Sequence, residues 1–247
     1  MHELLVVNPN TSPAITRLIA RQVEAALPAG TRARTLGVDW GTPSVETRID
    51  AAVASVAVLD VLAQQQGMQG VLVAAFGDPG LLAARELLDV PVVGIGESAL
   101  LRARELGDFA ILTLQPASVP LVAELVRANH CEDRCVAIAA LPVAVLDAAD
   151  PGALRERLAE HAVRLARSWR IQSVVLGGAP LGLHAEHLSG LLGLPCINPV
   201  AAGLQRLAAL AAQQDLEHRS PSYRGLRRKN FEGPFSFLEH LNQALWR

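Results

Sequence analysis

The chain has little of several residue types that would direct its fold or its location. It holds only three cysteines in 247 residues, an odd and sparse set that favours a reducing compartment over a disulfide framework. Its net charge of −2 leaves no basic excess for a nucleic acid. No apolar run reaches the roughly 18 residues of a membrane span, and the first residues lack the basic region and cleavage site of a signal peptide. We therefore expect a cytoplasmic protein that binds neither nucleic acid nor a membrane.

A motif that occurs twice determines the expected architecture. Residues 71–95 and 174–199 each contain an apolar run, a small-residue turn, an amphipathic stretch and a second apolar run that follows a proline. Such a repeat indicates two related half-molecules. Uninterrupted apolar runs that alternate with helical stretches, at about 46–67 and 152–168, are typical of parallel strands covered on both faces. The sequence predicts an α/β fold with two similar lobes of parallel β-sheet flanked by helices, related by a pseudo-twofold axis, with a ligand cleft between them.

The expected lobes are residues 1–106 and 107–205. At this length the chain can bury roughly three quarters of its unfolded surface, so its stability requires neither disulfides nor metal. We expect the helix after Pro199 to close the second lobe. Residues 206–247 form the third predicted part, a closing helix and a tail rich in aromatic and basic residues. Because solvated tails are usually poor in aromatics, residues 235–246 are predicted to form a short helix on the body or on another subunit, and we expect a homo-oligomer.

The ends of the predicted strands locate the expected site. In open parallel sheets, ligands bind beyond the carboxyl ends of the strands. In this chain those ends are expected at residues 8–12, 75–80, 113–118 and 177–181. Ala75 of the first repeat corresponds to Gly178 of the second, so we expect these two residues to face one another across the cleft.

Several residues near these ends are candidates for binding a small ligand. The backbone amides of Phe76, Gly77 and Ala179 would line small-residue turns at helix starts, which bind anions readily. Pro180 has no N–H group, so the second turn has one donor fewer than a glycine there would give. The side chains that can donate hydrogen bonds to a carbonyl or carboxylate oxygen are those of Asn10, Ser44 and Thr113.

Some of these residues belong to strings by which the chain resembles a known group of enzymes. It resembles the aspartate/glutamate/hydantoin racemase superfamily, most closely its hydantoin and allantoin racemase branch, over about residues 3–212, and is similar also to arylmalonate decarboxylases. The resemblance implies a cofactor-free enzyme that moves a proton at the carbon next to a carboxylate or a cyclic ureide carbonyl. The strings are Val7-Asn8-Pro9-Asn10-Thr11-Ser12, Pro43-Ser44-Val45-Glu46, Phe76-Gly77-Asp78-Pro79-Gly80, Gly94-Ile95-Gly96-Glu97, and Leu176-Gly177 with Ala179.

The resemblance also implies two catalytic cysteines, one in each lobe. One thiolate removes the proton and the other thiol delivers one, and a thiol pKa of about 8.5 makes both protonation states accessible near neutrality. The resemblance places these cysteines where this chain has Ala75 and Gly178, whereas arylmalonate decarboxylases keep the second one. Family members often have a threonine where this chain has Leu114. The motifs therefore do not support two-thiol racemisation here, and they leave room for a changed ligand.

Few residues can replace the missing thiols. Asp78 is either a general base or the cap of the helix that follows it, and its turn chemistry favours the cap. His184 has the natural side chain for proton transfer at neutral pH, but a histidine on a helix surface is the simpler interpretation. We interpret all three cysteines as structural; they are Cys131, Cys135 and Cys196.

Three functional interpretations remain. The leading one is an enzyme of the racemase superfamily, isomerase-like or lyase-like, that acts on a small carboxylate or cyclic amide with the two-cysteine mechanism lost or replaced. The second is a non-catalytic binding protein that has kept the cleft. The third is a chain whose cysteines were exchanged to trap a ligand. None of the three interpretations requires a cofactor or a metal ion.

Overall fold

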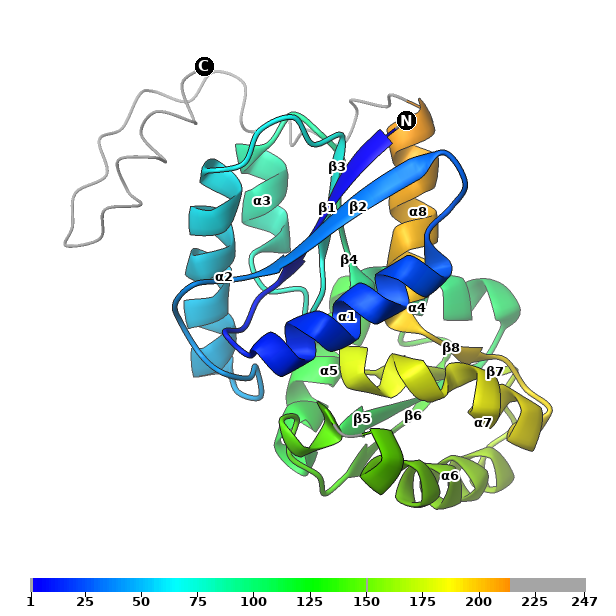
Figure 1. The fold of residues 1–247 in the computed structure, drawn as a ribbon. Helices are drawn as coiled ribbons and strands as arrows, with labels where there is room; N and C mark the ends of the chain where they lie inside the picture. Colours follow the sequence, from blue (N-terminus) through cyan, green and yellow to red (C-terminus); the bar gives the residue numbers. More distant parts are fainter. Residues whose placement is uncertain (1, 150, 214–247) are drawn as a thin grey trace.

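A computed structural model describes residues 2–149 and 151–213 and contains two four-stranded parallel sheets (Figure 1). The first sheet has the order β2-β1-β3-β4, with β1 (His2–Asn8), β2 (Thr31–Gly37), β3 (Gly70–Val73) and β4 (Val92–Gly94). The second has the order β6-β5-β7-β8, with β5 (Phe109–Leu114), β6 (Cys135–Leu141), β7 (Ser173–Gly177) and β8 (Cys196–Ile197). The two orders correspond strand for strand, so the predicted α/β fold is confirmed.

Helices connect successive strands in both sheets. Those of the first half are α1 (Pro13–Ala26), α2 (Arg48–Ala63), α3 (Leu81–Leu87) and α4 (Ile95–Leu106). Those of the second half are α5 (Val119–Ala128), α6 (Pro151–Ser168), α7 (Ala185–Leu192) and α8 (Pro199–Gln213), with short 3₁₀ helices η1 (Pro116–Ser118), η2 (Asp147–Ala149) and η3 (Ala179–His184). The start of α1 follows from its sequence, because the Ser12 side chain accepts a hydrogen bond from the Ile15 amide and Pro13 occupies the first helical position.

Each sheet is covered by helices on both faces, as its apolar strands predict. Successive side chains of a strand point to opposite faces. In β1, Leu5 and Val7 pack with buried residues of α2 and α3, whereas Leu4 and Val6 pack with those of α1 and α8. The same alternation in β5 directs Leu112 to α6 and α7, and Ile111 to α4 and α5.

The last helix of each half packs on the sheet of the other half. Buried residues of α4, among them Leu100, pack with Phe109 and Val175 of the second sheet. Buried residues of α8, among them Leu207, pack with Leu4 and Leu72 of the first sheet, beside which Figure 1 shows this helix. We expected the helix after Pro199 to close the second lobe, and that expectation is wrong. The apolar face of α8 is evident in the sequence, but the sheet that it covers is not.

Parts of the earlier expectations are not tested by this structure. The expected lobe boundaries at residues 106 and 205 remain predictions, since α4 and α8 connect both sheets. The predicted helix at 235–246 lies outside the described residues.

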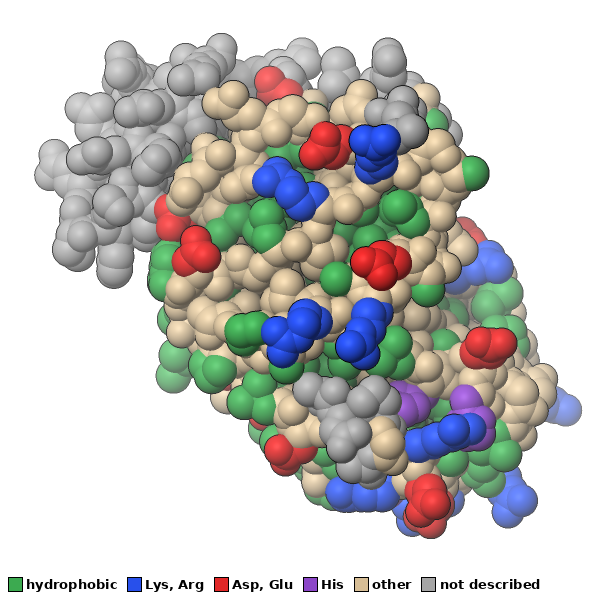
Figure 2. All heavy atoms as spheres, in the orientation of Figure 1, with side chains coloured by type: hydrophobic (Ala, Val, Ile, Leu, Met, Phe, Trp, Pro, Cys, Tyr) green, Lys and Arg blue, Asp and Glu red, His purple; other side chains and the backbone are tan. Residues whose placement is uncertain are grey.

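No helix of the described part is long and apolar enough to cross a membrane. On the face drawn in Figure 2, acidic and basic side chains are interspersed.

Candidate functional site

A cavity of about 310 Å³ lies where the two sheets meet, at the carboxyl ends of their strands. The turn after β3 contributes residues 74–77, and the turn after β7 contributes residues 177–180. Asn10 follows β1, and Thr113 lies near the end of β5. All four expected strand ends therefore contribute to one cavity. Ala75 and Gly178 both line it, in corresponding turns.

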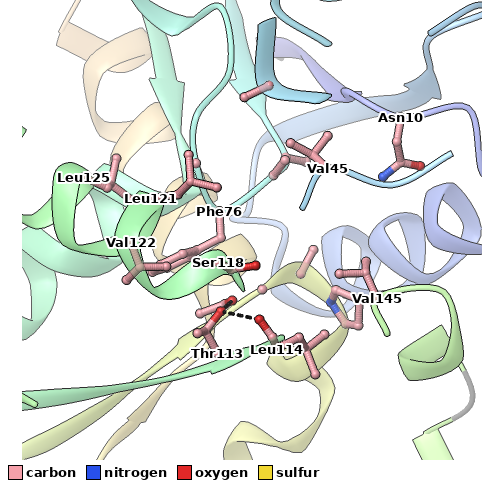
Figure 3. A pocket seen from close by; sticks show the side chains of 18 of the residues that line it. Asn10, Val45, Phe76, Thr113, Leu114, Ser118, Leu121, Val122, Leu125 and Val145 are labelled. Atoms are coloured by element: carbon pink, nitrogen blue, oxygen red, sulfur yellow. Dashed lines mark hydrogen bonds between the residues drawn. The ribbon is translucent and has the colours of Figure 1, made fainter. Parts of the chain in front are cut away.

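Aliphatic side chains form much of the cavity wall. Leu121, Val122 and Leu125 come from α5, and Figure 3 shows them on the opposite side of the view from Asn10. Further apolar side chains on the lining are those of Ile15, Val45, Phe76, Leu114, Val145 and Pro180. A ligand in this cavity would thus place much of its surface against hydrocarbon.

Two side chains have hydrogen-bond donors that no described residue uses. The Asn10 side-chain oxygen accepts from Asn8 Nδ2 and from the Ser12 amide, both at 3.0 Å. These bonds fix the orientation of the buried Asn10 amide group, and its nitrogen has no acceptor among the described residues. Ser118 lines the cavity from the start of α5, and its hydroxyl is likewise without a partner in the described part of the chain. Our sequence reasoning did not single out Ser118, although it lies in the strand end expected at 113–118.

Thr113 is used within the protein. Its buried hydroxyl donates to the Gly177 carbonyl oxygen at 2.7 Å and so connects the end of β5 to the turn after β7. The hydroxyl proton is therefore engaged, and Thr113 can offer a ligand only oxygen lone pairs. Its expected donor role toward a ligand does not fit this geometry.

Backbone amides in the two turns include some that the protein does not use. The Asp78 amide donates to the Ala75 carbonyl in the first turn, and the Leu181 amide donates to the Gly178 carbonyl in the second. The amides of Phe76, Gly77 and Ala179 have no acceptor among the described residues, and all three residues line the cavity. Unpaired amide donors of both lobes thus belong to residues that line one cavity.

Ser44 is not on the cavity lining. Its hydroxyl donates to Glu46 Oε1 at 2.7 Å, and the neighbouring Val45 lines the cavity instead. The sequence string around Ser44 identified the right loop but the wrong residue, because the orientation of side chains in an irregular segment is not periodic.

Asp78 is buried away from the cavity lining. Its carboxylate accepts hydrogen bonds from the amides of Gly96 at 2.8 Å and Glu97 at 2.7 Å, at the start of α4. The N-cap of the helix that follows Asp78 is Gly80, so the expectation that Asp78 caps α3 is wrong. It caps α4 instead. Burial raises the pKa of Asp78 to about 7, against the opposing effect of the two backbone hydrogen bonds.

His184 is buried too, and it does not line the cavity. It is the last residue of η3, which packs against α6 and α7, and so the expectation of a surface helix histidine is wrong. Burial lowers the pKa of His184, with smaller contributions from His187 and Arg155. Neither candidate for replacing the thiols therefore reaches the ligand site.

Among the described lining residues, Glu124 on α5 is the only one with an ionisable side chain. It forms an ion pair with Arg48 at the start of α2, and this pair links the two halves of the chain beside the cavity. Both side chains are largely exposed, so the pair contributes little to stability.

The three cysteines lie away from the cavity lining, in keeping with our structural interpretation of them. Burial raises the pKa of the Cys135 and Cys196 thiols to about 11 and that of the Cys131 thiol in the same direction. A thiol that resists ionisation is a poor nucleophile or base at neutral pH.

Two parallel sheets of corresponding order, whose turns meet at one cavity, define a two-lobed α/β protein with a cavity between its halves. The profile of the Asp/Glu/Hydantoin racemase family matches residues 4–207, and the chain belongs to this family. The resemblance stated from its sequence strings is thereby confirmed.

The chain is similar to several named relatives. It is 30% identical to the hydantoin racemase of Rhizobium meliloti over 212 residues, 83% of this chain and 87% of that protein. It is 29% identical to the hydantoin racemase of Pseudomonas sp. (strain NS671) over 207 residues, 82% of this chain and 83% of that protein.

The chain is also similar to proteins of solved structure. The allantoin racemase from Klebsiella pneumoniae superposes with a TM-score of 0.89 at 32% identity, covering 96% of this chain and 99% of that one. An arylmalonate decarboxylase, at 18% identity and a TM-score of 0.58 over 85% of this chain and 92% of that one, shares the fold.

Proposed function

We propose that this chain is a cofactor-independent member of the racemase family that acts on a small carboxylate or cyclic amide held in the cavity, and that it does not use two thiols. The observation that carries the proposal is the composition of the two turns. They supply amide donors from both lobes, yet Ala75 and Gly178 occupy the positions where the resemblance implies cysteines.

The free donors suit the oxygen atoms of such a ligand. The amides of Phe76 and Gly77 approach from one lobe and that of Ala179 from the other, with Asn10 Nδ2 and the Ser118 hydroxyl as side-chain donors. Donors fixed before the ligand arrives stabilise negative charge on a carboxylate, or on the enolate that forms when a proton leaves the adjacent carbon. The aliphatic wall would accommodate an apolar substituent of the ligand.

A specific observation also favours a second candidate, a binding protein without catalysis. Asp78 and His184, the two residues considered as replacements, do not line the cavity. The turns themselves have room for larger side chains, since a Cβ atom built at Gly178 would meet its nearest neighbours at 3.9 Å. A site with donors but no acid or base beside the turns can bind a ligand without exchanging its proton.

One experiment separates the two candidates. Binding of 5-benzylhydantoin, allantoin and phenylacetate is measured by calorimetry, and deuterium uptake at the carbon next to the carbonyl is followed by NMR in D₂O. Binding with enzyme-dependent uptake supports the enzyme, and Glu124→Gln then tests the one ionisable lining residue. Binding without uptake supports the binding protein. Failure of all three compounds to bind contradicts the proposed ligand class.

A further inference from the structure

Asp78 has an unusual backbone conformation next to the cavity. Its φ of 48° lies in the left-handed region, which non-glycine residues seldom adopt. Such conformations persist where the surrounding structure fixes them, and they concentrate at functional sites. Here the fixing contacts are the two hydrogen bonds that the Asp78 carboxylate accepts from the amides of Gly96 and Glu97.

The start of α4 is shaped to receive this carboxylate. A Cβ atom at Gly94 would lie 2.1 Å from the Asp78 carboxyl carbon, and one at Gly96 would lie 3.0 Å from Asp78 Oδ2. Glycine at both positions therefore makes room for the acid. Asp78 is too deeply buried for water to replace these hydrogen bonds readily.

The charged groups around Asp78 come from three helices. Glu97 of α4 lies next to it and pairs with Arg85 of α3 at 2.5 Å and with Arg206 of α8 at 2.6 Å. Glu97 raises the pKa of Asp78 and Arg85 lowers it, but both effects are smaller than that of burial. The turn after β3 is thus connected to α4, which packs on the second sheet, and through Glu97 to α8.

We propose that Asp78 is a positioning residue for the ligand: by holding the turn after β3 against the start of α4, it fixes the Phe76 and Gly77 amides toward the cavity. The inference rests on the proposed function in one respect, that these amides bind the ligand. Asp78 itself does not line the cavity and so acts through the turn.

The second half of the chain has a corresponding connection. Asn198 lies just before α8 and accepts hydrogen bonds from the amides of Val200 at 2.9 Å and Ala201 at 3.2 Å. Its Nδ2 donates to the Gly182 carbonyl, in η3, at 3.0 Å. In the first half a side chain of the cavity turn itself bonds to the start of α4, and in the second half Asn198 connects η3, which follows the cavity turn, to the start of α8.

The two connections differ in their chemistry. Asn198 does not titrate, whereas burial places the pKa of Asp78 at about 7. A protonated carboxyl keeps one good acceptor oxygen, so protonation weakens one of the two bonds to α4. Ligand affinity should therefore fall as the pH decreases through about 7. This change should come from the first turn alone, because only its connecting side chain titrates.

The test compares three variants with the wild-type chain, using 5-benzylhydantoin as the probe in calorimetry from about pH 5.5 to about pH 8.5, on either side of the Asp78 pKa. The wild type should lose about tenfold in affinity toward acid pH, the scale of one hydrogen bond to a charged group. Asp78→Asn tolerates the same backbone and should bind about tenfold more weakly than the wild type at high pH, with a flat profile.

Two control variants identify what is specific to Asp78. Asn198→Ala should weaken binding but retain the wild-type pH profile. Ser98→Ala removes a 2.6 Å bond to the Gly94 carbonyl in the same first turn of α4, and it should leave both affinity and profile unchanged. An Asp78→Asn protein that binds with the wild-type affinity and pH profile would overturn the proposal.

A readout without ligand keeps this inference separate from the proposed function. The amide NMR signals of Phe76 and Gly77 should shift with a midpoint near pH 7 in the wild type and stay constant in Asp78→Asn. If no probe binds but these signals titrate, the proposed ligand class is wrong and the positioning role stands. Phe76 and Gly77 signals that coincide in the folded wild type and in Asp78→Asn at every pH would refute the role of Asp78 whatever the ligand.

Discussion

Restoring two thiols tests whether the cavity retains the geometry of its family. The nearest neighbours of a Cβ atom at Gly178 would be Leu114, Leu181 and Pro180, at 3.9 Å, and the backbone there is extended, with a φ of 168°. Ala75 already lines the cavity. By contrast, a Cβ atom at Gly182 would lie 2.3 Å from Gln22 Oε1. The Ala75→Cys, Gly178→Cys double variant should therefore fold with a stability within about 1 kcal/mol of the wild type.

This double variant should catalyse proton exchange at the carbon next to a carbonyl. A well-placed general acid or base contributes roughly 10²–10⁴-fold, so even a loosely placed pair should exceed the background rate. Each single cysteine variant should exchange deuterium on one face of the substrate without racemising it, because racemisation requires proton transfer on both faces.

Deuterium uptake by each enantiomer of 5-benzylhydantoin is measured by NMR, and racemisation is followed by circular dichroism. The matched control is Ala75→Ser with Gly178→Ser, which fills a similar volume with hydroxyl groups and should show no more exchange than the wild type. If the double cysteine variant folds and binds the hydantoin but exchanges nothing, the cavity has been rebuilt for other chemistry or for binding alone, and our racemase-like interpretation is wrong.

Three further predictions concern stability. Leu207→Ala on α8 should lower the free energy of unfolding by about 2.7–5 kcal/mol in urea, because the side chain packs over the first sheet, and a loss below about 1 kcal/mol would contradict that packing. Burial raises the pKa of Asp78 from 3.8 to about 7, so the folded state holds this proton more tightly than the unfolded state. The free energy of unfolding should therefore fall by on the order of 4 kcal/mol for this group as the pH rises from about 4 to about 7; Asp78→Asn should lack this slope, and equal slopes would refute the assignment. His184 has the opposite sign, since its pKa is lowered from 6.5 and stability is lost as the pH falls below that value. His184→Gln should lose less stability in acid, and melting curves that change in parallel for both proteins would contradict this.

The fold and the place of the cavity could be predicted because they depend on periodic features. Apolar runs without alternation predict strands buried on both faces, and parallel strands direct their carboxyl ends to one edge of a sheet. The internal repeat then assigns Ala75 and Gly178 to corresponding turns, and both residues line the cavity.

Contacts between distant segments could not be predicted in this way. Asp78 was expected to cap the helix that follows it, yet its partners lie 18 and 19 residues further on, at the start of α4. The burial of His184 depends on how η3 packs, which no local pattern encodes. That Ser118 lines the cavity and Ser44 does not likewise depends on side-chain orientations that the sequence does not encode.

The crossing of α8 onto the first sheet has a consequence during synthesis of the chain. Strand β4 ends at Gly94 and α8 begins at Pro199, so the face of the first sheet that carries Leu4 and Leu72 is covered only in part, by α1, while 105 further residues are added. At ribosomal rates of about 5–20 residues per second this interval lasts roughly 5 to 20 s. A nascent first half therefore presents the part of this apolar face that α8 later covers to chaperones or to other chains until the second half has emerged. The half of the molecule that is synthesised first is therefore the half whose packing is completed last.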